Sequence, residues 1–290
     1  MAKMKAMAPV LPDLLVEEAV RAALLEDLGR AGDITTYATI APDATAKAVM
    51  ASREEGVVAG MALAETAFRL VDPSVRFKAL VKDGDRLKKG TVLARVSGNA
   101  RAILTAERTA LNYLMHLCGI ATHTRLYADT IAHTKAKVTC TRKTIPGLRA
   151  LEKYAVRCGG GSNHRYGLDD AILIKDNHIA VAGGVGEAIR AARAYAGHLV
   201  KLEVEVTSLA ELKTALKERP DVILLDNMSP KTLERAVEIA AGTTVLEASG
   251  GIALDTIAAV AETGVDYIST SKITMAAPTL DIGLDVVMEK

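Results

Sequence analysis

From about residue 137 onward, short runs of apolar and β-branched residues alternate with stretches that have the spacing of amphipathic helices. Two of these helices have clear start signals: Ser208-Leu-Ala-Glu211 is a capping box, and Ser229-Pro230 supplies an N-cap followed by proline at the first helical position. Strands that are joined through helices run parallel, so the pattern predicts a repeated β-α unit. The expected strands are Val138–Thr141, Ala171–Ile174, Leu199–Val206, Val222–Leu225, Thr244–Ala248 and Tyr267–Ser269.

Six such strands without a reversal signal are compatible with two α/β architectures, an open doubly wound sheet or a barrel. A complete eight-fold barrel usually needs about 250 residues. The stretch that remains after residue 137 is shorter than this. Only an incomplete barrel therefore fits the available length.

The first part of the chain has a different pattern. Leu15–Leu28 is spaced as an amphipathic helix that Gly29–Asp33 ends, and Lys82–Leu93 has the turn-rich composition of antiparallel strands. We expect a separate α+β module here. Leu104–Leu117 predicts one further helix, with Thr105 as its N-cap, that links the two domains.

Composition narrows the function. Fifty per cent of the 290 residues are apolar, which supports a large core, and a net charge of +1 argues against a general nucleic-acid surface. Cys118, Cys140 and Cys158 are odd in number and lack metal-ligand spacing, so neither a disulfide framework nor a zinc site is indicated. Met1–Pro12 has no apolar segment, and no run approaches the roughly 18 apolar residues of a membrane span. We expect a cytoplasmic protein that binds neither nucleic acid nor membrane.

The chemistry is expected where the strands end, because ligands of parallel α/β folds bind at the C-terminal ends of the strands. All six ends are polar. A lysine after three apolar residues in Ala171–Lys175 looks buried and needs an anionic partner, either a ligand or a neighbour such as Asp176. Structural ion pairs produce similar patterns, so each residue also has a purely structural interpretation. The strand ends carry Arg142-Lys143, Lys175-Asp176-Asn177, Glu203 with Glu205, Asp226-Asn227, Ser249-Gly250-Gly251 and Ser269-Thr270-Ser271-Lys272.

The last two strand ends have the composition of a phosphate site. They are small, hydroxylic and glycine-rich, and each precedes a helix N-terminus or a turn whose free N–H groups attract anions. The glycines of Gly183–Gly186 do not complete a dinucleotide fingerprint, and the sequence contains no Walker A pattern.

Nine segments along the chain carry a resemblance to a known family: Glu26–Gly29, Gly32–Thr36, Thr105–Asn112, Thr141–Arg149, Glu152–Gly161, His164–Leu168, Ile174–His178, Leu225–Asn227 and Glu247–Gly251. With these segments the chain resembles the quinolinate phosphoribosyltransferase family from end to end. The resemblance implies an N-terminal α/β sandwich over residues 1–115 and an open seven-stranded α/β barrel over residues 116–275, with a tail of residues 276–290 that returns to the first domain.

The resemblance also implies a reaction: quinolinate and phosphoribosyl pyrophosphate give nicotinate mononucleotide, pyrophosphate and carbon dioxide, with Mg²⁺, in NAD biosynthesis. The enzyme would be a pentosyltransferase and a homodimer with shared active sites. Arginine suits a dicarboxylate because its guanidinium binds carboxylates in a bidentate manner. The implied quinolinate ligands are Arg142, His164, Arg165, Lys175 and Arg108 of the other subunit.

For the second substrate, Lys143 would bind the diphosphate, while Glu205 and Asp226 would lie at the ribose hydroxyls and the metal region. Glu203 is the less certain of the two glutamates on its strand. Lys143, Lys175, Glu205 and Asp226 are the candidate catalytic residues, and no residue is assigned as a direct metal ligand. The expected 5′-phosphate contacts are Ser249, Gly250, Gly251, Thr270, Ser271 and Lys272.

Three alternatives follow from the same residues. A sister phosphoribosyltransferase would use nicotinate, although a clamp for two carboxylates argues against it. A Schiff base on Lys175 would resemble barrel aldolases, but arginine and histidine neighbours favour a carboxylate partner. Finally, Asp83–Leu93 resembles half of a biotinyl or lipoyl carrier domain. This sequence, however, has no modifiable lysine in the hairpin where such a domain carries it.

Overall fold

The computed structural model describes residues 9–287, so most of the expected N-terminal segment Met1–Pro12 and the last three residues of the tail lie outside the described part. The chain forms two compact units. The first comprises the chain up to His123, the segment Leu151–Gly160 and the tail from Ala277 onward; the second comprises Thr124–Ala150 and Gly161–Ala276. Our expected boundary near residue 115 stays a prediction.

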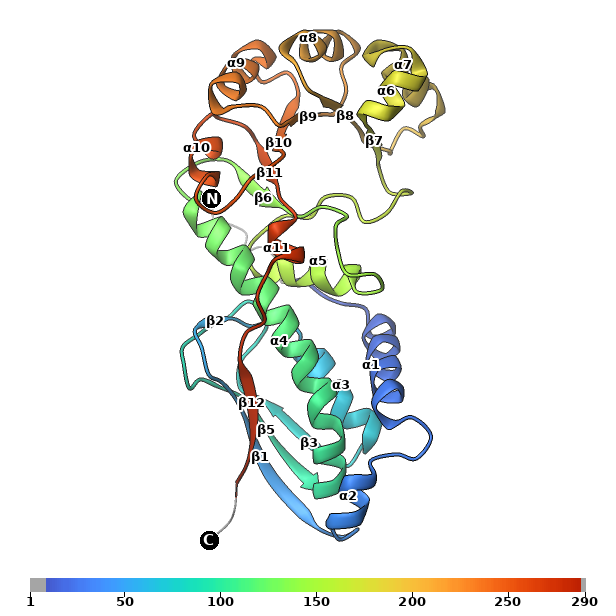
Figure 1. The fold of residues 1–290 in the computed structure, drawn as a ribbon, viewed down its shortest axis with the longest axis vertical. Helices are drawn as coiled ribbons and strands as arrows, with labels where there is room; N and C mark the ends of the chain where they lie inside the picture. The colour runs from blue at the N-terminus through green and yellow to red at the C-terminus, as the bar shows by residue number, and fades with distance from the viewer. Residues whose placement is uncertain (1–8, 288–290) are drawn as a thin grey trace, which may run out of the picture. The chain divides into compact units, whose positions relative to one another are not determined.

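The first unit contains a four-stranded antiparallel sheet in the order β12-β1-β5-β3 (Figure 1). The tail completes this sheet, since Met50 of β1 pairs with Leu284 of β12. A separate pair of two-residue strands, β2 and β4, lies in the same unit. The strand bounds are Thr45–Ser52 for β1, Gly56–Val57 for β2, Arg76–Ala79 for β3, Arg86–Leu87 for β4, Val92–Asn99 for β5 and Ile282–Val287 for β12.

The helices of this unit pack through apolar faces that the sequence pattern provides. Phe68 of α3 stacks on Phe77 of β3 with ring centroids 5.8 Å apart. The predicted first helix is confirmed as α1. The helix bounds are Asp13–Leu28 for α1, Ile34–Thr39 for α2, Met61–Val71 for α3, Ala100–Thr130 for α4 and Arg149–Cys158 for α5.

Helix α4 is 31 residues long and begins earlier than expected. Our assignment of Thr105 as its N-cap is wrong, because the Asn99 side chain at the end of β5 already accepts the N–H of Ala102 at 3.1 Å. Thr105 instead donates its hydroxyl to the Asp33 carboxylate at 3.0 Å. The helix starts in the first unit and ends in the second.

Gly119 on α4 allows the tail to approach the helix closely. A Cβ atom at this position would lie 2.1 Å from the carbonyl oxygen of Pro278. The neighbouring contact is a hydrogen bond from the Leu280 N–H to the Met115 carbonyl at 2.9 Å. Only glycine therefore permits this path of the tail toward β12.

The second unit contains a six-stranded parallel sheet in the order β6-β11-β10-β9-β8-β7. Figure 1 shows these strands as an arc with α7, α8 and α9 on its outer side. A parallel bridge between Thr139 and Ser162 adds one more position beyond β6. Because β7 lies at the opposite end of the order, the barrel is open between Ser162 and β7.

The six predicted strands are confirmed, with shifts of a few residues at their ends. The strand bounds are Lys137–Thr139 for β6, Ile172–Ile174 for β7, Leu202–Val206 for β8, Val222–Asp226 for β9, Val245–Ser249 for β10 and Tyr267–Ser269 for β11. The helices are Asp176–Ala182 for α6, Val185–Tyr195 for α7, Leu209–Glu218 for α8, Pro230–Ala240 for α9, Ile257–Ala261 for α10 and Lys272–Met275 for α11.

The predicted helix starts in this unit are real caps. The Ser229 hydroxyl accepts the N–H of Thr232, and the Ser208 hydroxyl accepts the N–H of Glu211 at 3.2 Å. The second half of the expected capping box differs, because the Glu211 carboxylate accepts the N–H of Thr207 at 2.8 Å. Within residues 9–287, no helix combines the length and the apolar character that a membrane crossing requires.

Candidate active site

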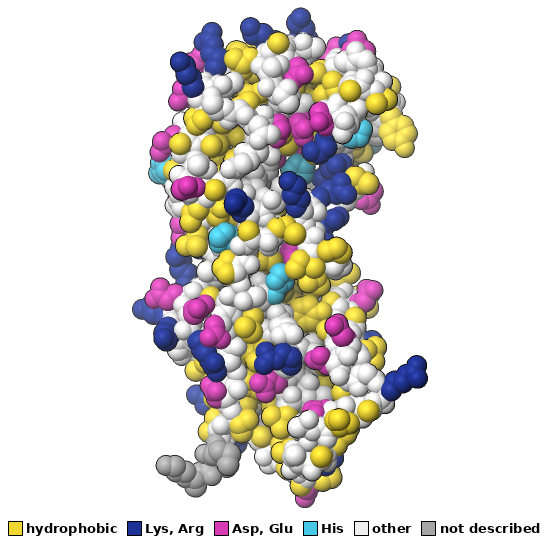
Figure 2. All heavy atoms as spheres, in the orientation of Figure 1, with side chains coloured by type: hydrophobic (Ala, Val, Ile, Leu, Met, Phe, Trp, Pro, Cys, Tyr) yellow, Lys and Arg dark blue, Asp and Glu magenta, His cyan; other side chains and the backbone are white. Residues whose placement is uncertain are grey.

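A cavity of about 590 Å³ lies at the C-terminal ends of the barrel strands. It brings together the strand-end residues that the sequence pattern selected. Figure 2 shows basic and acidic side chains close together on the surface of the part of the molecule that contains the barrel unit. The predicted residues that line the cavity are Arg142, Lys143, His164, Arg165, Lys175, Glu205, Asp226, Ser249, Gly250, Gly251, Thr270, Ser271 and Lys272.

The cavity wall carries a surplus of positive charge. Five Lys and Arg side chains line it, against three Asp and Glu side chains. Burial, and then the nearby charge of Arg142, lower the pKa of Arg165 from its usual value, while Glu203 opposes this shift. Two guanidinium groups that repel each other in a partly buried cavity favour an anionic ligand between them.

Lys175 occupies a different environment from the one expected. Strand β7 ends at Ile174, so Lys175 stands at the start of α6, and half of its side chain is exposed. The expectation of a buried lysine is therefore wrong. Its partner is a neighbouring carboxylate, as one of the two expectations had it: Nζ lies 2.8 Å from Glu205 on the adjacent strand, and Asp176 is not the partner.

The Arg165 side chain is held by one hydrogen bond to a backbone carbonyl, and one of its donor atoms has no partner. Its Nη1 donates to the Ala171 carbonyl at 2.9 Å, whereas its Nε is buried and has no hydrogen-bond partner. A buried donor without a partner costs about 1–3 kcal/mol.

Glu203 and Glu205 of β8 lie two residues apart and therefore face the same side of the sheet, as predicted, and both are buried. They have different surroundings. Glu205 lines the cavity and pairs with Lys175, whereas Glu203 does not line it and lies 2.9 Å from the His164 imidazole.

Glu247 of β10 is a cavity residue that the strand-end argument missed. It lies in mid-strand, between the buried apolar side chains of Leu246 and Ala248. The sequence signal that could have identified Glu247 is a single acidic residue between apolar residues of a strand. Burial, and then the charge of Glu203, raise the pKa of the Glu247 carboxyl, and His164 opposes this shift.

The glycine-rich loop after β10 approaches the end of β9 closely. Gly250 has a φ of +96°, and a Cβ atom there would lie 2.2 Å from the side-chain oxygen of Asn227. The Asn227 N–H donates to the Ser249 carbonyl at 2.9 Å. Glycine is thus required where the backbone lines the cavity.

The segment after β11 lies in the cavity wall, but the helix that follows it is short. Helix α11 has four residues, so its dipole adds little to anion binding and the expected contribution from a helix N-terminus is overestimated. The Thr270 hydroxyl donates to the Ile252 carbonyl at 3.1 Å, and the Thr274 hydroxyl donates to the Lys143 carbonyl at 2.9 Å. These bonds tie three strand ends together.

Arg108, which the family resemblance placed at the site, does not line the cavity. It is exposed on α4, in the part of the helix that belongs to the first unit. Its predicted role at a site shared between subunits stays a prediction.

A curved parallel sheet with a cation-rich cavity at its C-terminal edge defines the class: an α/β-barrel enzyme that acts on an anionic small molecule. Two family profiles identify it further. The N-terminal domain of quinolinate phosphoribosyl transferase matches residues 33–118, and the C-terminal domain matches residues 120–285. The chain therefore belongs to the quinolinate phosphoribosyltransferase family.

Named relatives agree with this assignment. The chain is 48% identical over 274 residues to a nicotinate-nucleotide pyrophosphorylase (carboxylating) of Mycobacterium leprae, covering 93% of this chain and 96% of the relative. It is 44% identical to a probable nicotinate-nucleotide pyrophosphorylase (carboxylating) of Bacillus subtilis, covering 91% of each chain. The match of residues 33–118 to the family's N-terminal domain also removes the carrier-domain alternative.

Solved structures share the whole fold. The nicotinate-nucleotide pyrophosphorylase of Francisella tularensis has a TM-score of 0.91 and 41% identity, covering 98% of this chain and all of that one. A human nicotinic acid phosphoribosyltransferase has a TM-score of 0.63 at 14% identity, covering 97% of this chain and 74% of that one. The second likeness concerns the fold alone.

Proposed function

We propose that the protein transfers the phosphoribosyl group of phosphoribosyl pyrophosphate to quinolinate, with decarboxylation, as a pentosyltransferase of de novo NAD biosynthesis. The products are nicotinate mononucleotide, pyrophosphate and carbon dioxide. The observation that carries this proposal is the cavity itself. Its five Lys and Arg side chains and three acidic side chains suit a dicarboxylate beside a pyrophosphate and a ribose.

In this proposal, the two carboxylates of quinolinate bind to Arg142, Arg165 and Lys175. The guanidinium groups of Arg142 and Arg165, which both line the cavity, supply the planar donors that carboxylates accept. His164 was predicted to join them. Its Nε2 lies 2.9 Å from Glu203, so it would have to leave this partner to donate to a ligand. Arg108 of the other subunit of a homodimer would complete the clamp.

The second substrate would occupy the opposite wall. Lys143 would bind the diphosphate, and Ser249, Gly250, Gly251, Thr270, Ser271 and Lys272 would surround the 5′-phosphate. Glu205 and Asp226 would face the ribose, where positive charge develops as pyrophosphate departs, and their carboxylates would stabilise it.

Glu205 reaches this role only if Lys175 releases it. The two side chains form an ion pair at 2.8 Å, and a quinolinate carboxylate would compete for the ammonium group. The substrate would therefore both occupy Lys175 and free Glu205. Once the pyridine nitrogen is bonded to the ribose and positively charged, the adjacent carboxylate leaves as carbon dioxide. The electron pair that stays on the ring carbon is stabilised by that nitrogen, and this carbon then takes a proton from water.

The acidic residues fit a magnesium ion. Mg²⁺ in phosphate-transferring sites usually binds one or two carboxylates and otherwise the substrate oxygens, and Glu205 and Asp226 offer carboxylates in the cavity wall. When bound, the ion would neutralise charge on the departing pyrophosphate. Lys143 and Lys272 line the same cavity and would bind phosphate oxygens of the substrate.

Three finer points belong to the same proposal. The Ser162 segment would be the seventh position of the family's open barrel, next to β6. The first domain would be the family's α/β sandwich. The enzyme would act in the cytoplasm as a homodimer.

Pyrophosphate release with quinolinate and with nicotinate tests the function. We expect turnover with quinolinate and negligible turnover with nicotinate, because a missing carboxylate deprives the cations of the cavity, among them the partly buried Arg165, of a partner, at a cost of about 1–3 kcal/mol for a buried donor. Comparable kcat/KM values for the two acids would contradict the proposal.

A further inference from the structure

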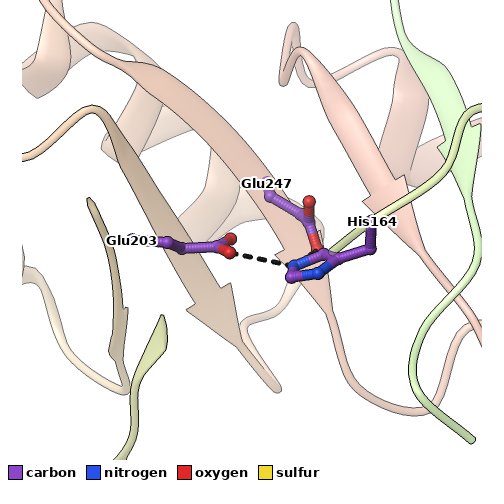
Figure 3. Close-up of side chains that lie close together, drawn as sticks. All are labelled: His164, Glu203 and Glu247. Atoms are coloured by element: carbon purple, nitrogen blue, oxygen red, sulfur yellow. Dashed lines mark ion pairs between the residues drawn. The ribbon is translucent and has the colours of Figure 1, made fainter. Parts of the chain in front are cut away.

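A buried cluster of His164, Glu203 and Glu247 crosses the interior of the barrel (Figure 3). Both carboxylates point at the imidazole ring, from β8 and from β10. Nε2 of His164 lies 2.9 Å from Glu203 and 3.7 Å from Glu247. His164 itself follows Ser162, which bridges to β6, so the cluster joins three separate parts of the barrel wall.

The hydrogen bonds of the imidazole define its tautomer. The backbone N–H of Arg165 donates to Nδ1 at 2.8 Å, so Nδ1 carries no proton. Nε2 then carries the proton and donates it to the Glu203 carboxylate. A cation bound at Nε2 would require the proton on Nδ1, where it would face the Arg165 N–H. The cluster is therefore a hydrogen-bonded support and not a metal centre.

The cluster lies at a partition between two cavities. His164, Arg165 and Glu247 line the cavity at the C-terminal strand ends and also a second cavity of about 560 Å³. Residues at the start of β9 and β10, Val222 and Val245, line the second cavity, which places it toward the N-terminal strand ends. Glu203 lines only the second of the two cavities, so it acts on the first cavity through His164.

Arg165 depends on this support. Its Nη1 bonds to the carbonyl of Ala171, immediately before β7, and this bond spans the opening of the barrel between Ser162 and β7. Among the described residues, no strand pairing joins the segment to β7, which pairs with β8. The His164–Glu203 hydrogen bond ties the segment to β8, beyond this opening.

We propose that Glu203 is a positioning residue: it accepts the Nε2 proton of His164 and so holds the His164–Arg165 segment where the Arg165 guanidinium meets the substrate carboxylate. This inference rests on the proposed function, because it assigns quinolinate to Arg165. Glu203 acts in this proposal as a hydrogen-bond acceptor, and its negative charge is not required to hold the segment. A glutamine can replace it in this role, whereas a leucine cannot.

The experiment compares Glu203→Gln and Glu203→Leu by steady-state pyrophosphate release, with each substrate varied in turn. We expect the leucine variant to raise the KM for quinolinate by about tenfold or more, with the KM for phosphoribosyl pyrophosphate within about twofold of wild type. The glutamine variant should keep both KM values within about threefold. Glutamine behaving like leucine, or an equal rise in both KM values, would overturn the proposal.

A matched control comes from the first unit. Glu152 is fully buried and lies 3.0 Å from the His116 imidazole, so Glu152→Leu breaks a similar pair outside the cavity. It should leave the ratio of the two KM values unchanged. A change in that ratio as large as the one from Glu203→Leu would also overturn the proposal.

Folding and function are kept separate in two ways. If Glu203→Leu alone does not fold, the double variant His164→Phe with Glu203→Leu removes both partners of this hydrogen bond, and the Arg165 N–H also loses its Nδ1 acceptor. The double variant should show the same rise in the KM for quinolinate, and a wild-type KM would refute the proposal. The wild-type protein is assayed alongside, and absence of quinolinate turnover there would refute the proposed function instead.

Discussion

Lys175 Nζ lies 2.8 Å from the Glu205 carboxylate, so a residue proposed for quinolinate is paired with a residue proposed for the ribose. The pair joins the ends of β7 and β8, which are neighbours in the sheet. Half of the Lys175 side chain is exposed, whereas Glu205 is buried, so the ammonium group is the partner that a ligand can reach. A doubly charged ligand would therefore compete with Glu205 for Lys175.

The ion pair predicts opposite effects of one substitution on binding and on turnover. Glu205→Gln should leave Lys175 without a competing carboxylate, so quinolinate alone should bind more tightly, by about two- to fivefold, a gain of the size expected for an ion pair with one exposed partner. Turnover should fall by about 100-fold or more, because the charge that stabilises the developing ribose cation is lost. Calorimetric titration and pyrophosphate release measure the two effects.

Asp226→Asn is the matched control for this experiment. Asp226 also lines the cavity, but its carboxylate accepts from Asn227 and is not paired with Lys175. We expect a similar loss of turnover without tighter quinolinate binding. Tighter binding in both variants would show that general repulsion, and not the Lys175–Glu205 pair, limits affinity.

The cations of the cavity should serve the ligand more than the fold. Arg142→Ala, Arg165→Ala and Lys175→Ala should each abolish measurable turnover, while the melting temperature falls by only a few degrees, because Arg142 and Lys175 are exposed. Arg165→Ala should cost the most stability of the three, as it also loses a hydrogen bond to Ala171. A variant that melts far below wild type but keeps its activity per folded molecule would instead favour a structural ion-pair role.

The local features of the fold were predictable because local interactions determine them. Ser208 and Ser229 cap their helices as the sequence indicates, and apolar runs between helices form the six parallel strands. Thr105 was misassigned because the helix begins several residues earlier than expected. Asn99, directly before the helix, accepts the N–H of Ala102 and so acts as its cap. The return of the tail to β1 is a contact between distant segments, and only the family resemblance indicated it.

The sequence indicated which residues line the cavity better than it indicated which of their side chains contact each other. Strand-end position identified the cavity residues, because parallel strands bring their C-terminal ends together. It did not reveal that Glu203 turns to His164 while Glu205 turns to Lys175, since both glutamates have the same strand phase. Glu247 was missed because it lies before the strand end.

The buried Glu247 carboxyl should make stability depend on pH. Its pKa is raised from 4.5 to about 7 in the folded protein, so the folded state retains a proton that the unfolded state has lost. The contribution of this protonated carboxyl to the free energy of unfolding is therefore full below about pH 4.5 and is lost as the pH rises toward about 7. Glu247→Gln stays neutral, and its stability relative to wild type should increase over this range by up to about 3 kcal/mol.

Urea unfolding of both proteins at several pH values between about 4.5 and about 7.5 measures this difference. A constant offset across the range would show that Glu247 does not carry the proton. Glutamine is nearly isosteric with the carboxylic acid, so packing changes should add little to the comparison.

The last prediction concerns Arg108, which lies on α4 outside the cavity. If each active site takes its Arg108 from the other subunit, Arg108→Ala and Lys175→Ala homodimers should each be inactive. A mixed dimer would contain one site with both lesions and one site with neither. Random exchange of equal amounts gives about half mixed dimers, so activity should recover to roughly a quarter of wild type when sites act independently.

Pyrophosphate release before and after subunit exchange measures the recovery, and native mass spectrometry confirms that mixed dimers have formed. Mixing Lys175→Ala with Arg142→Ala is the control, because both residues line the cavity of the same chain. Every site in that mixture carries one lesion, so activity should not return. Mixed dimers of Arg108→Ala and Lys175→Ala that form and remain inactive would show that Arg108 acts within its own chain or supports folding alone.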